Sequence, residues 1–321
     1  MLTVDYLAPV QDLFHEVEER MLLQSDGYHA ELGAALRHLL GSGGKRIRVA
    51  VTLLAGRMFN AERDRLVTLA AAIELLHTAT LVHDDLIDGA LIRRGLPTLN
   101  AQWTPAATVL TGDFIFGRAA KLASQTDSLP VIHLFAETVS TIVNGEISQM
   151  FGKRGIISRE EYNQRIFAKT ASLFETATKS AALVGEADGN TVSKLAVYGR
   201  EVGMAFQIID DVLDFTGEQT TVGKPVANDL RQGLVTLPVM YYCEIMPDDP
   251  DLGLVLSKRP CDEQTIDRLV ESIRRSGAIN RAMQEADRYV QRGLAALNGL
   301  PEKVEKRSLI DLAKFVTQRN K

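Results

Sequence analysis

Two short segments of the chain each carry three aspartates at a spacing that suits one turn of a helix. They are Asp84-Asp85-Leu-Ile-Asp88 and Asp210-Asp211-Val-Leu-Asp214. If each segment is helical, its first and last carboxylates project from one face, because residues i and i+4 lie one above the other. Apolar runs, 79–82 and 206–209, precede the two segments and must face the protein interior. The two acidic groups therefore belong to largely apolar helices.

The aspartate spacing indicates divalent cations. A single D-D-x-x-D on a polar helix is most often a solvated helix end. Here the spacing occurs twice on apolar helices, and no lysine or arginine at i±4 neutralises it. Because unpaired buried charges are costly, the six carboxylates predict bound cations, and carboxylate oxygens favour Mg²⁺ before Ca²⁺. Since Mg²⁺ keeps several waters and bridges to substrate phosphates, the sequence predicts a phosphate ester as ligand.

Basic residues near these segments suit a phosphate ligand. They are Lys45 and Arg48 in Gly43-Gly-Lys-Arg-Ile-Arg48, Arg93 and Arg94 before Gly95, Lys169 before Thr170, and Lys224 between Gly223 and Pro225. Arginine makes bidentate phosphate contacts, and lysine supplies a compact positive charge. Each pair alone is more often a solvated face. The glycine–lysine element is not a P-loop, because G-x-x-x-x-G-K-[ST] is unmet and no strand precedes it.

Helices must position all of these groups. Apolar residues recur at intervals of three and four, for example at Leu66, Leu69, Ile73 and Leu76, and alternating strand-like stretches are scarce. Breaks are predicted at 41–44, 95–97, 152–158, 185–190, 217–225 and 247–250. Ser158, with Glu161 three residues later, predicts a capping box. We predict about a dozen helices in one all-α domain spanning residues 1–321.

The composition excludes several classes of protein. The chain has 321 residues, of which 45% are hydrophobic and 24% charged, the balance of a globular protein. A formal charge of −5 argues against nucleic acid as a partner. Two cysteines, Cys243 and Cys261, allow neither a disulfide framework nor a four-cysteine zinc site. Neither a secretory signal nor an apolar run of about 18 residues is predicted, so we expect a soluble, cytoplasmic protein without a membrane span.

Together the segments resemble the trans-isoprenyl diphosphate synthase family. Motifs in the family's order are Gly43-Gly-Lys-Arg-Ile-Arg48, His77 with Asp84 to Asp88, Arg93-Arg-Gly95, Lys169-Thr170, Gln207 with Asp210 to Asp214, Gly223-Lys-Pro225, Asn228-Asp-Leu230, and Thr236-Leu-Pro238. The resemblance covers roughly residues 30 to 245. Leu234 departs from it, since many members have lysine there. The resemblance implies an antiparallel helical bundle around a deep central cavity (the isoprenoid synthase fold), usually as a homodimer.

The resemblance also implies a reaction and roles for the residues. An allylic diphosphate, such as farnesyl diphosphate, condenses repeatedly with isopentenyl diphosphate, which releases inorganic diphosphate and lengthens an all-trans chain. Three Mg²⁺ ions would have Asp84, Asp88 and Asp210 as direct ligands, with Asp85, Asp211 and Asp214 as supporting or water-mediated partners. The allylic diphosphate would contact Arg93, Lys169, Thr170, Gln207 and Lys224. Isopentenyl diphosphate would contact Lys45, Arg48, His77 and Arg94. An ordinary buried core histidine is the alternative reading of His77, which lies two turns before Asp84 on the same face.

Two small residues and one aromatic residue bear on the predicted length of the product. Thr80 lies one turn below Asp84 on the same helix face, and the resemblance adds Ala79 to the wall of the tunnel for the growing chain. Short-chain members place a bulky aromatic at one of these positions, and here both are small. On one face of a second helix, Glu146 would lie near the diphosphates and Phe135 about 16 Å deeper, at ~1.5 Å per residue. Phe135 could then form the floor of the tunnel, but ordinary core packing explains this residue equally well. We therefore predict a long product, octaprenyl diphosphate first within a hexaprenyl to decaprenyl range. The resemblance implies that such chains become the side chains of quinones.

Four other functions remain open from the sequence. A geranylgeranyl or farnesyl diphosphate synthase would make a shorter product. A terpene cyclase or squalene-type synthase would not need the second diphosphate pocket formed by Lys45, Arg48, His77 and Arg94. A catalytically silent subunit of a two-component prenyl synthase would be expected to lack acidic or basic motif residues. A helical scaffold protein would leave the six clustered aspartates unexplained.

Overall fold

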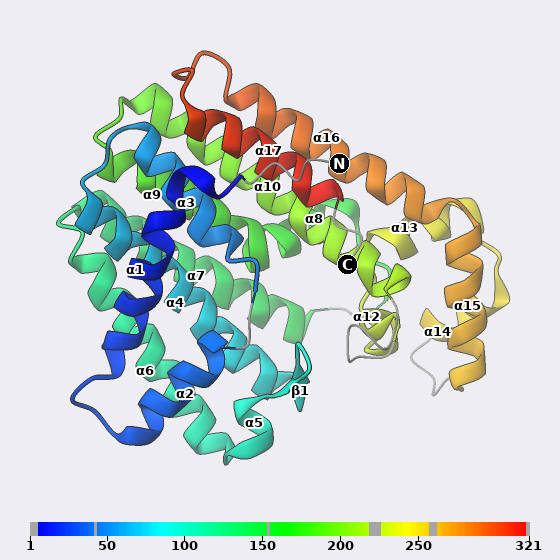
Figure 1. The fold of residues 1–321 in the computed structure, drawn as a ribbon. Helices are drawn as coiled ribbons and strands as arrows, with labels where there is room; N and C mark the ends of the chain where they lie inside the picture. The colour runs from blue at the N-terminus through cyan, green and yellow to red at the C-terminus, as the bar shows by residue number, and fades with distance from the viewer. Residues whose placement is uncertain (1–5, 42–43, 153–154, 218–225, 257–261, 319–321) are drawn as a thin grey trace. The chain divides into compact units, whose positions relative to one another are not determined.

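The computed structural model describes residues 6–41, 44–152, 155–217, 226–256 and 262–318. Over these residues the chain is almost entirely helical (Figure 1), as the periodicity of the apolar residues predicts. It divides into two compact units, each made of separate stretches. Unit 1 comprises Met1–Val139, Leu173–Gly199 and Ala296–Leu312, and unit 2 comprises Ser140–Ser172, Arg200–Ala295 and Ala313–Lys321. Each unit is described by itself below, and the single domain expected from the sequence stays a prediction.

Unit 1 holds the N-terminal helices and a small hairpin. Its elements are η1 (Ala8–Val10), α1 (Gln11–Leu22), η2 (Leu23–Ser25), α2 (Ala30–Gly41), α3 (Ile47–Met58), α4 (Arg63–Ile87), β1 (Ile92–Arg93), β2 (Leu96–Pro97), α5 (Leu99–Gln102), α6 (Pro105–Ser124) and α9 (Ser172–Val184), the last of which begins one residue before the unit does. Four longer helices have residues in both units: α7 (Leu129–Phe151), α10 (Gly189–Thr216), α16 (Ala278–Ala296) and α17 (Val304–Gln318).

Unit 2 holds the segment before the second acidic motif and most of the C-terminal helices. Its own elements are α8 (Arg159–Ile166), η3 (Phe167–Ala171), α12 (Asn228–Arg231), α13 (Leu237–Ile245), α14 (Pro250–Leu256) and α15 (Glu263–Arg275). Helix α15 packs against α13 and α14. The predicted capping box begins α8: Glu161 N–H donates to Ser158 Oγ at 3.1 Å, and Ser158 N–H donates to a Glu161 carboxylate oxygen at 2.7 Å. This prediction is confirmed.

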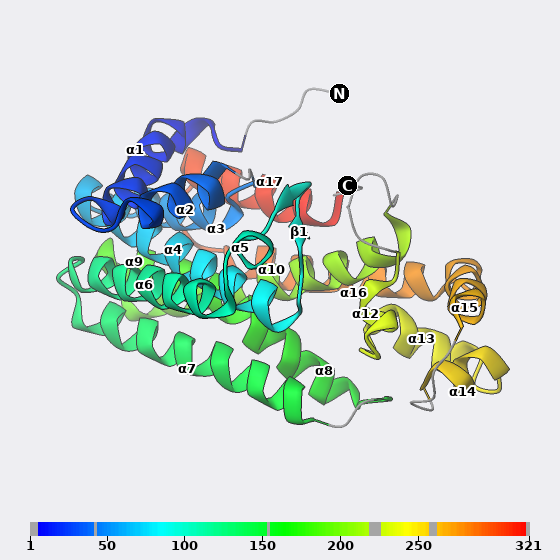
Figure 2. The same cartoon turned by 90° about the horizontal axis from the view of Figure 1, so that it is seen from below.

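Helix α4 forms the core of unit 1 and carries the first acidic motif at its end. It packs against α1, α3 and α6, and Figure 2 shows α4 among these helices. The carboxylate of Glu62 begins the helix by accepting the N–H groups of Asp64 and Arg65. By length and composition α4 could cross a membrane, which the sequence-based expectation overlooked. However, 78% of its most apolar 18-residue window is buried inside the protein, as in the core helix of a globular domain.

A two-stranded hairpin that the sequence reading did not predict follows α4. Strands β1 and β2 pair antiparallel, with Arg93 opposite Leu96. Arg94 (φ 51°) and Gly95 (φ 77°) occupy the two turn positions, and successive positive φ values are the signature of a tight type I′ hairpin turn. The hydroxyl of Thr98 ties the hairpin to the end of α4 by donating to the Ala90 carbonyl at 2.7 Å. The Arg93-Arg-Gly95 segment is therefore a tight hairpin turn rather than a simple helix break.

A π-helical turn, η3, interrupts the helical stretch from α8 to α9 and contains Lys169 and Thr170. Single π turns inside α-helices occur frequently at functional sites, because the extra residue redirects the side chains. Helix α7 approaches this turn closely at Gly145. A Cβ there would lie 2.6 Å from the Cβ of Ala168, so only glycine fits. The close contact thus depends on one residue that has no side chain.

Candidate active site

The first acidic motif ends α4 with two carboxylates one turn apart. The N–H of Asp88 donates to the carbonyl of Asp84 at 2.8 Å, so the helical register continues through the motif as predicted. Asp84 is half-buried and Asp88 is exposed. His83 does not join them: its ring packs against Gly112 of α6, and its Nε2 lies 3.4 Å from the Asp113 carboxylate. The side chains of Asp84 and Asp88 therefore offer oxygen atoms, without a histidine nitrogen from His83 beside them.

The expectation that no basic residue neutralises the acidic motifs is wrong for Asp85. This carboxylate is 5% exposed, and Arg93 of β1 donates to both of its oxygens, with Nε at 2.9 and 3.0 Å. The Nη2 atom of Arg93 also lies 2.8 Å from Oδ1, which completes a bidentate pair. Helical spacing of four residues does not predict this partner, because Arg93 lies eight residues after Asp85 and reaches it only through the hairpin. Asp85 thus holds Arg93 in place, whatever else Arg93 binds.

Four arginines in unit 1 lie near enough to His77 for their charges to act on its ring. Burial lowers the pKa of His77 well below its usual 6.5, and the positive charges of Arg48, Arg94, Arg93 and Arg46 lower it further. A neutral ring among guanidinium groups can donate one hydrogen bond to an anion without adding a charge that would have to be desolvated. Three of the residues predicted for isopentenyl diphosphate, Arg48, His77 and Arg94, therefore lie together.

Two close contacts shape this arginine cluster. The Arg94 guanidinium packs on Gly44, where a Cβ would lie 2.5 Å from Nη1, so the glycine lets the hairpin reach the loop that carries Lys45. The Arg48 guanidinium carbon lies 4.8 Å from the centroid of the Phe174 ring, a cation–π distance. Lys45, which follows Gly44 in the sequence, is exposed to solvent. The sequence reading identified the basic residues but not the ring beneath Arg48.

A buried ion pair anchors the loop before α3. Arg46 has a left-handed backbone (φ 44°), and its Nη1 donates to Oε1 of Glu74 on α4 at 2.8 Å, while Nη2 donates to the Leu40 carbonyl at 2.9 Å. Their side chains are only 13% and 6% exposed. Removing one partner of a buried pair leaves an uncompensated charge. The sequence did not point to Arg46 and Glu74, because neither fits a ligand motif. A glutamate within the apolar part of α4 could have indicated that a buried basic partner was needed.

The lowered pKa of His77 predicts an altered dependence of stability on pH. Below pH 6.5 the unfolded chain binds a proton at His77 that the folded protein does not, so the free energy of unfolding falls as the pH is lowered. Replacing His77 by glutamine should reduce the stability lost between pH 7 and pH 5 by up to about 2 kcal/mol. Urea unfolding of both proteins at the two pH values measures this. Equal losses for the two proteins would show that His77 is protonated in the folded state.

The second acidic motif lies in unit 2, and protein groups bind Asp211 and Asp214. Asp211 is 3% exposed; it accepts Tyr162 OH at 2.7 Å and Gln207 Nε2 at 2.9 Å. Burial and the carboxylate of Asp229 raise the pKa of Asp211 to about 7, and the two hydrogen bonds oppose that shift. Asp214 accepts the N–H groups of Asn228 and Asp229, both at 3.1 Å, at the start of the short helix α12. Asp210 is half-buried.

The lysine–threonine pair of η3 faces polar partners in unit 2. Lys169 Nζ lies 2.7 Å from Oε1 of Glu146 on α7. The hydroxyl of Thr170 donates to Oε1 of Gln207 at 2.6 Å. Thr170, Gln207 and Asp211 are therefore linked, which the sequence order alone did not reveal. Lys224, the last predicted contact of the allylic diphosphate, lies outside the described residues. Leu234, at which the sequence departs from the predicted family, is half-buried.

The residues predicted to set chain length lie inside unit 1. Ala79 is 2% exposed, and Thr80 is half-buried with its hydroxyl donating to the His77 carbonyl at 2.8 Å. Phe135 is 6% exposed, and its ring centroid lies 6.3 Å from that of Phe116 on α6. This contact suits a packed core and a tunnel floor equally. The roles of these residues stay predictions.

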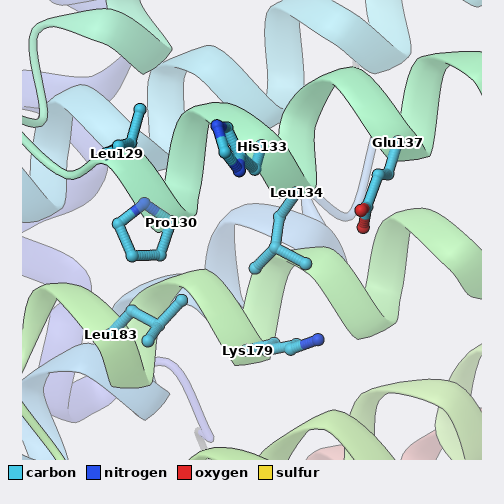
Figure 3. Close-up of a pocket in the computed structure, with 7 residues that line it drawn as sticks. All are labelled: Leu129, Pro130, His133, Leu134, Glu137, Lys179 and Leu183. Carbon is cyan, nitrogen blue, oxygen red and sulfur yellow. The ribbon is translucent and has the colours of Figure 1, made fainter.

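A surface cavity of about 390 Å³ lies between α7 and α9 of unit 1 (Figure 3). Leu134 and Leu183 form part of its apolar wall, and His133, Glu137 and Lys179 supply its polar groups. Its lining includes none of the residues predicted for metal, diphosphate or chain-length control. This cavity is therefore not the predicted tunnel.

The acidic residues fit Mg²⁺ by their chemistry. Asp84 and Asp88 offer carboxylate oxygens, and the nearby His83 ring is turned toward α6. Within the described residues, no three His, Cys, Asp or Glu side chains gather closely enough to hold a metal by themselves. Mg²⁺ binds through one or two carboxylates, several waters and substrate phosphates rather than in an all-protein cage. These residues could therefore hold Mg²⁺ together with a bound diphosphate.

Comparison with known proteins gives one consistent result. The model of the family described as "Polyprenyl synthetase" matches residues 29–273. Heptaprenyl diphosphate synthase component 2 of Geobacillus stearothermophilus is 37% identical over 306 residues, 95% of each chain. Octaprenyl diphosphate synthase of Escherichia coli K12 is 35% identical over 88% of each chain. A crystal structure of a polyprenyl synthase from Caulobacter crescentus CB15, complexed with calcium and isoprenyl diphosphate, superposes with a TM-score of 0.93 at 33% identity, covering 98% of this chain and 97% of that one.

These matches confirm the predicted family and the all-α isoprenoid synthase fold, since the family model spans more than half of the chain. Enzymes of this family transfer prenyl groups between diphosphate substrates and depend on divalent metal ions. The chain belongs to the polyprenyl synthetase family and is a trans-prenyl diphosphate synthase.

Proposed function

We propose that this enzyme condenses isopentenyl diphosphate repeatedly with an allylic diphosphate, farnesyl diphosphate in the first instance, to make a long all-trans polyprenyl diphosphate. The observation that carries the proposal is the arginine cluster around His77. Its positive charge suits a diphosphate, and Arg48, Arg94 and His77 in it lie outside the carboxylates of the first acidic motif. A terpene cyclase ionises one diphosphate and needs no such second pocket. Two diphosphate pockets are what a chain-elongating synthase requires.

Isopentenyl diphosphate would bind in unit 1. Arg48 and Arg94 would supply bidentate guanidinium donors, Lys45 would add a further positive charge, and neutral His77 would donate one hydrogen bond. The contact of Arg94 with Gly44 holds the hairpin beside the lysine-bearing loop. The ion pair of Arg46 with Glu74 keeps that loop against α4.

The allylic diphosphate would be held by Arg93, Lys169, Thr170, Gln207 and Lys224. Asp84, Asp88 and Asp210 are proposed as ligands of Mg²⁺, three ions per active site, with Asp85, Asp211 and Asp214 in supporting positions. When bound, Mg²⁺ would neutralise the charge that develops on the departing diphosphate. Lys169 and Arg93 would add positive charge that stabilises the same leaving group.

The protein's own residues would control the reaction in three steps. The bond between the allylic carbon and the diphosphate oxygen breaks, and the resulting carbocation is shielded from water by apolar side chains. The double bond of isopentenyl diphosphate attacks this carbon and forms the new carbon–carbon bond. A proton then leaves, and an oxygen of the released diphosphate accepts it. Longer chains repeat these steps while the product extends past Thr80 and Ala79.

Substitutions should separate the two diphosphate pockets. Arg94→Ala or Lys45→Ala should mainly raise the KM for isopentenyl diphosphate, if these residues bind it equally in the ground and transition states. Lys169→Ala should instead act on the allylic substrate, and so should Arg93→Ala, although that change also leaves Asp85 buried without its partner. Steady-state kinetics with each substrate varied in turn measures the effects. As a control, Lys194→Ala removes a surface lysine whose Nζ donates to the Asn298 carbonyl. The assignment fails if the variants respond identically to both substrates.

Product length decides between the long-chain proposal and its alternatives. We propose octaprenyl diphosphate, within a hexaprenyl to decaprenyl range, as a precursor of quinone side chains; a geranylgeranyl or farnesyl product is the alternative. The heptaprenyl and octaprenyl synthases among the relatives support a long chain. Pure protein incubated with Mg²⁺, farnesyl diphosphate and labelled isopentenyl diphosphate should give products with about 30 to 50 carbons. Products that stop at 15 or 20 carbons contradict the proposal.

We further propose that the chain is active by itself as a homodimer. One relative is named as component 2 of a heptaprenyl synthase, so a second, different subunit is the alternative. Exposed apolar side chains along one side of α7 support association: Ile132, Val143, Ile147 and Met150 are 37–60% exposed. Apolar stripes of this kind mark protein interfaces. Turnover by the purified chain and a dimer mass in light scattering are expected; the cytoplasmic location stays a prediction from the sequence.

A further inference from the structure

A chain of hydrogen bonds in unit 2 connects a buried tyrosine to the predicted allylic-diphosphate residues. Tyr162 OH donates to Asp211 Oδ2 at 2.7 Å, and Gln207 Nε2 donates to Asp211 Oδ1 at 2.9 Å. Thr170 Oγ1 then donates to Gln207 Oε1 at 2.6 Å. Tyr162 and Thr170 belong to the α8–η3 stretch, whereas Gln207 and Asp211 belong to α10. The bonds at both ends of this series, Tyr162 to Asp211 and Thr170 to Gln207, therefore connect the α8–η3 stretch to α10.

When Asp211 is ionised, the donors and acceptors in this series of hydrogen bonds allow only one orientation of the Gln207 amide. Asp211, when ionised, accepts from Tyr162 and from Gln207 Nε2, so the amide oxygen must face the Thr170 hydroxyl. One N–H of Gln207 Nε2 is left over for another partner. Tyr162 is 0%, Asp211 3% and Thr170 5% exposed, but Gln207 is half-buried. A ligand that approaches this chain can therefore reach it at the amide of Gln207.

Tyr162 supplies the fixed end of this arrangement. Its hydroxyl is the donor at one oxygen of a buried carboxylate, and its ring lies 5.6 Å from the guanidinium carbon of Arg165. Arg165 in turn donates to the Val235 carbonyl at 2.6 Å. Without the tyrosine hydroxyl, Asp211 would lose one of its two hydrogen bonds. It could then rotate and release the amide of Gln207.

We propose that Tyr162 is a positioning residue for the allylic substrate: through Asp211 it holds the Gln207 amide and the Thr170 hydroxyl in the orientation that receives the allylic diphosphate. This inference rests on the proposed function of Gln207 and Thr170. It also assigns Asp211 a role within the protein, which differs from the metal-ligand role proposed for the neighbouring Asp210. Asp211 orients a neutral hydrogen-bond donor.

The test removes only the hydroxyl, in Tyr162→Phe, and compares it with Tyr198→Phe. Tyr198 is equally buried, at 0% exposure, and its hydroxyl donates to the Leu309 carbonyl at 2.7 Å in unit 1, so each substitution removes one buried hydroxyl and its hydrogen bond. Tyr162→Phe should lower kcat/KM for the allylic diphosphate about tenfold and leave the KM for isopentenyl diphosphate within about twofold. Tyr198→Phe should change neither. Equal kinetics of the two variants would overturn the proposal.

A double-mutant cycle separates positioning from a general structural effect. If Tyr162 acts through Gln207, Tyr162→Phe should reduce kcat/KM for the allylic diphosphate by less than about twofold when added to Gln207→Leu. Losses that multiply would overturn the inference while leaving the assignment of Gln207 intact. Full activity of Gln207→Leu alone would instead refute the proposed function of Gln207, and the inference with it. If Tyr162→Phe does not fold, Asp211→Asn in the same cycle should show the same coupling, and multiplying losses there again refute it.

Discussion

Replacing Asp84 or Asp210 by alanine is expected to lower kcat at least about 10²-fold, because each loses several kcal/mol of transition-state stabilisation. These two carboxylates are proposed Mg²⁺ ligands in units 1 and 2. Both residues are half-buried at the ends of apolar segments, so removing mutually repelling charge should cost little stability. Turnover at saturating Mg²⁺ and both substrates measures the effect, and thermal unfolding shows whether the fold survives.

The control is Asp64→Ala at the opposite end of α4. The Asp64 side chain is 71% exposed and pairs with Arg20, so its loss should leave turnover within about twofold. Near-normal turnover of either Asp84→Ala or Asp210→Ala would exclude a role of that carboxylate in ionising the substrate. A fall in kcat for all three variants would instead point to a general loss of active protein.

Adding an aromatic ring near the start of the tunnel is expected to shorten the product. Ala79→Phe or Thr80→Phe should give products of about the C15–C20 class, because the new ring fills space that the growing chain needs. Phe135→Ala should lengthen the product if Phe135 is the floor, at a cost of about 3–5 kcal/mol from the cavity left beside Phe116. Chromatographic sizing of labelled products measures both effects.

A matched substitution controls for the added ring. Val197 on α10 is 43% exposed, so Val197→Phe adds the same ring at the surface and should leave the product distribution unchanged. If active Ala79→Phe and Thr80→Phe enzymes still make full-length products, the chain does not pass this face of α4. The long-chain prediction would then lose its structural basis.

Local sequence patterns predicted the helices, the break at 185–190 and the spacing within each acidic motif, whereas the predicted break at 217–225 lies almost wholly outside the described residues. Ser158 and Glu161 form their capping box, and Asp84 and Asp88 stand one turn apart, because these contacts join residues three or four positions apart on one helix. The all-α class follows from the same periodicity, and the family follows from the order of the motifs.

The tertiary structure decided the partners of the charged groups. Arg93 reaches Asp85 only because Arg94 and Gly95 form a tight turn, and Asp211 meets Tyr162 from 49 residues away. Such pairs depend on how elements pack, and no periodicity within one helix predicts them. The sequence by itself therefore determined which residues could do the chemistry. Packing decided which of them are held by protein groups, because a buried charge must find its partner wherever the fold brings one close.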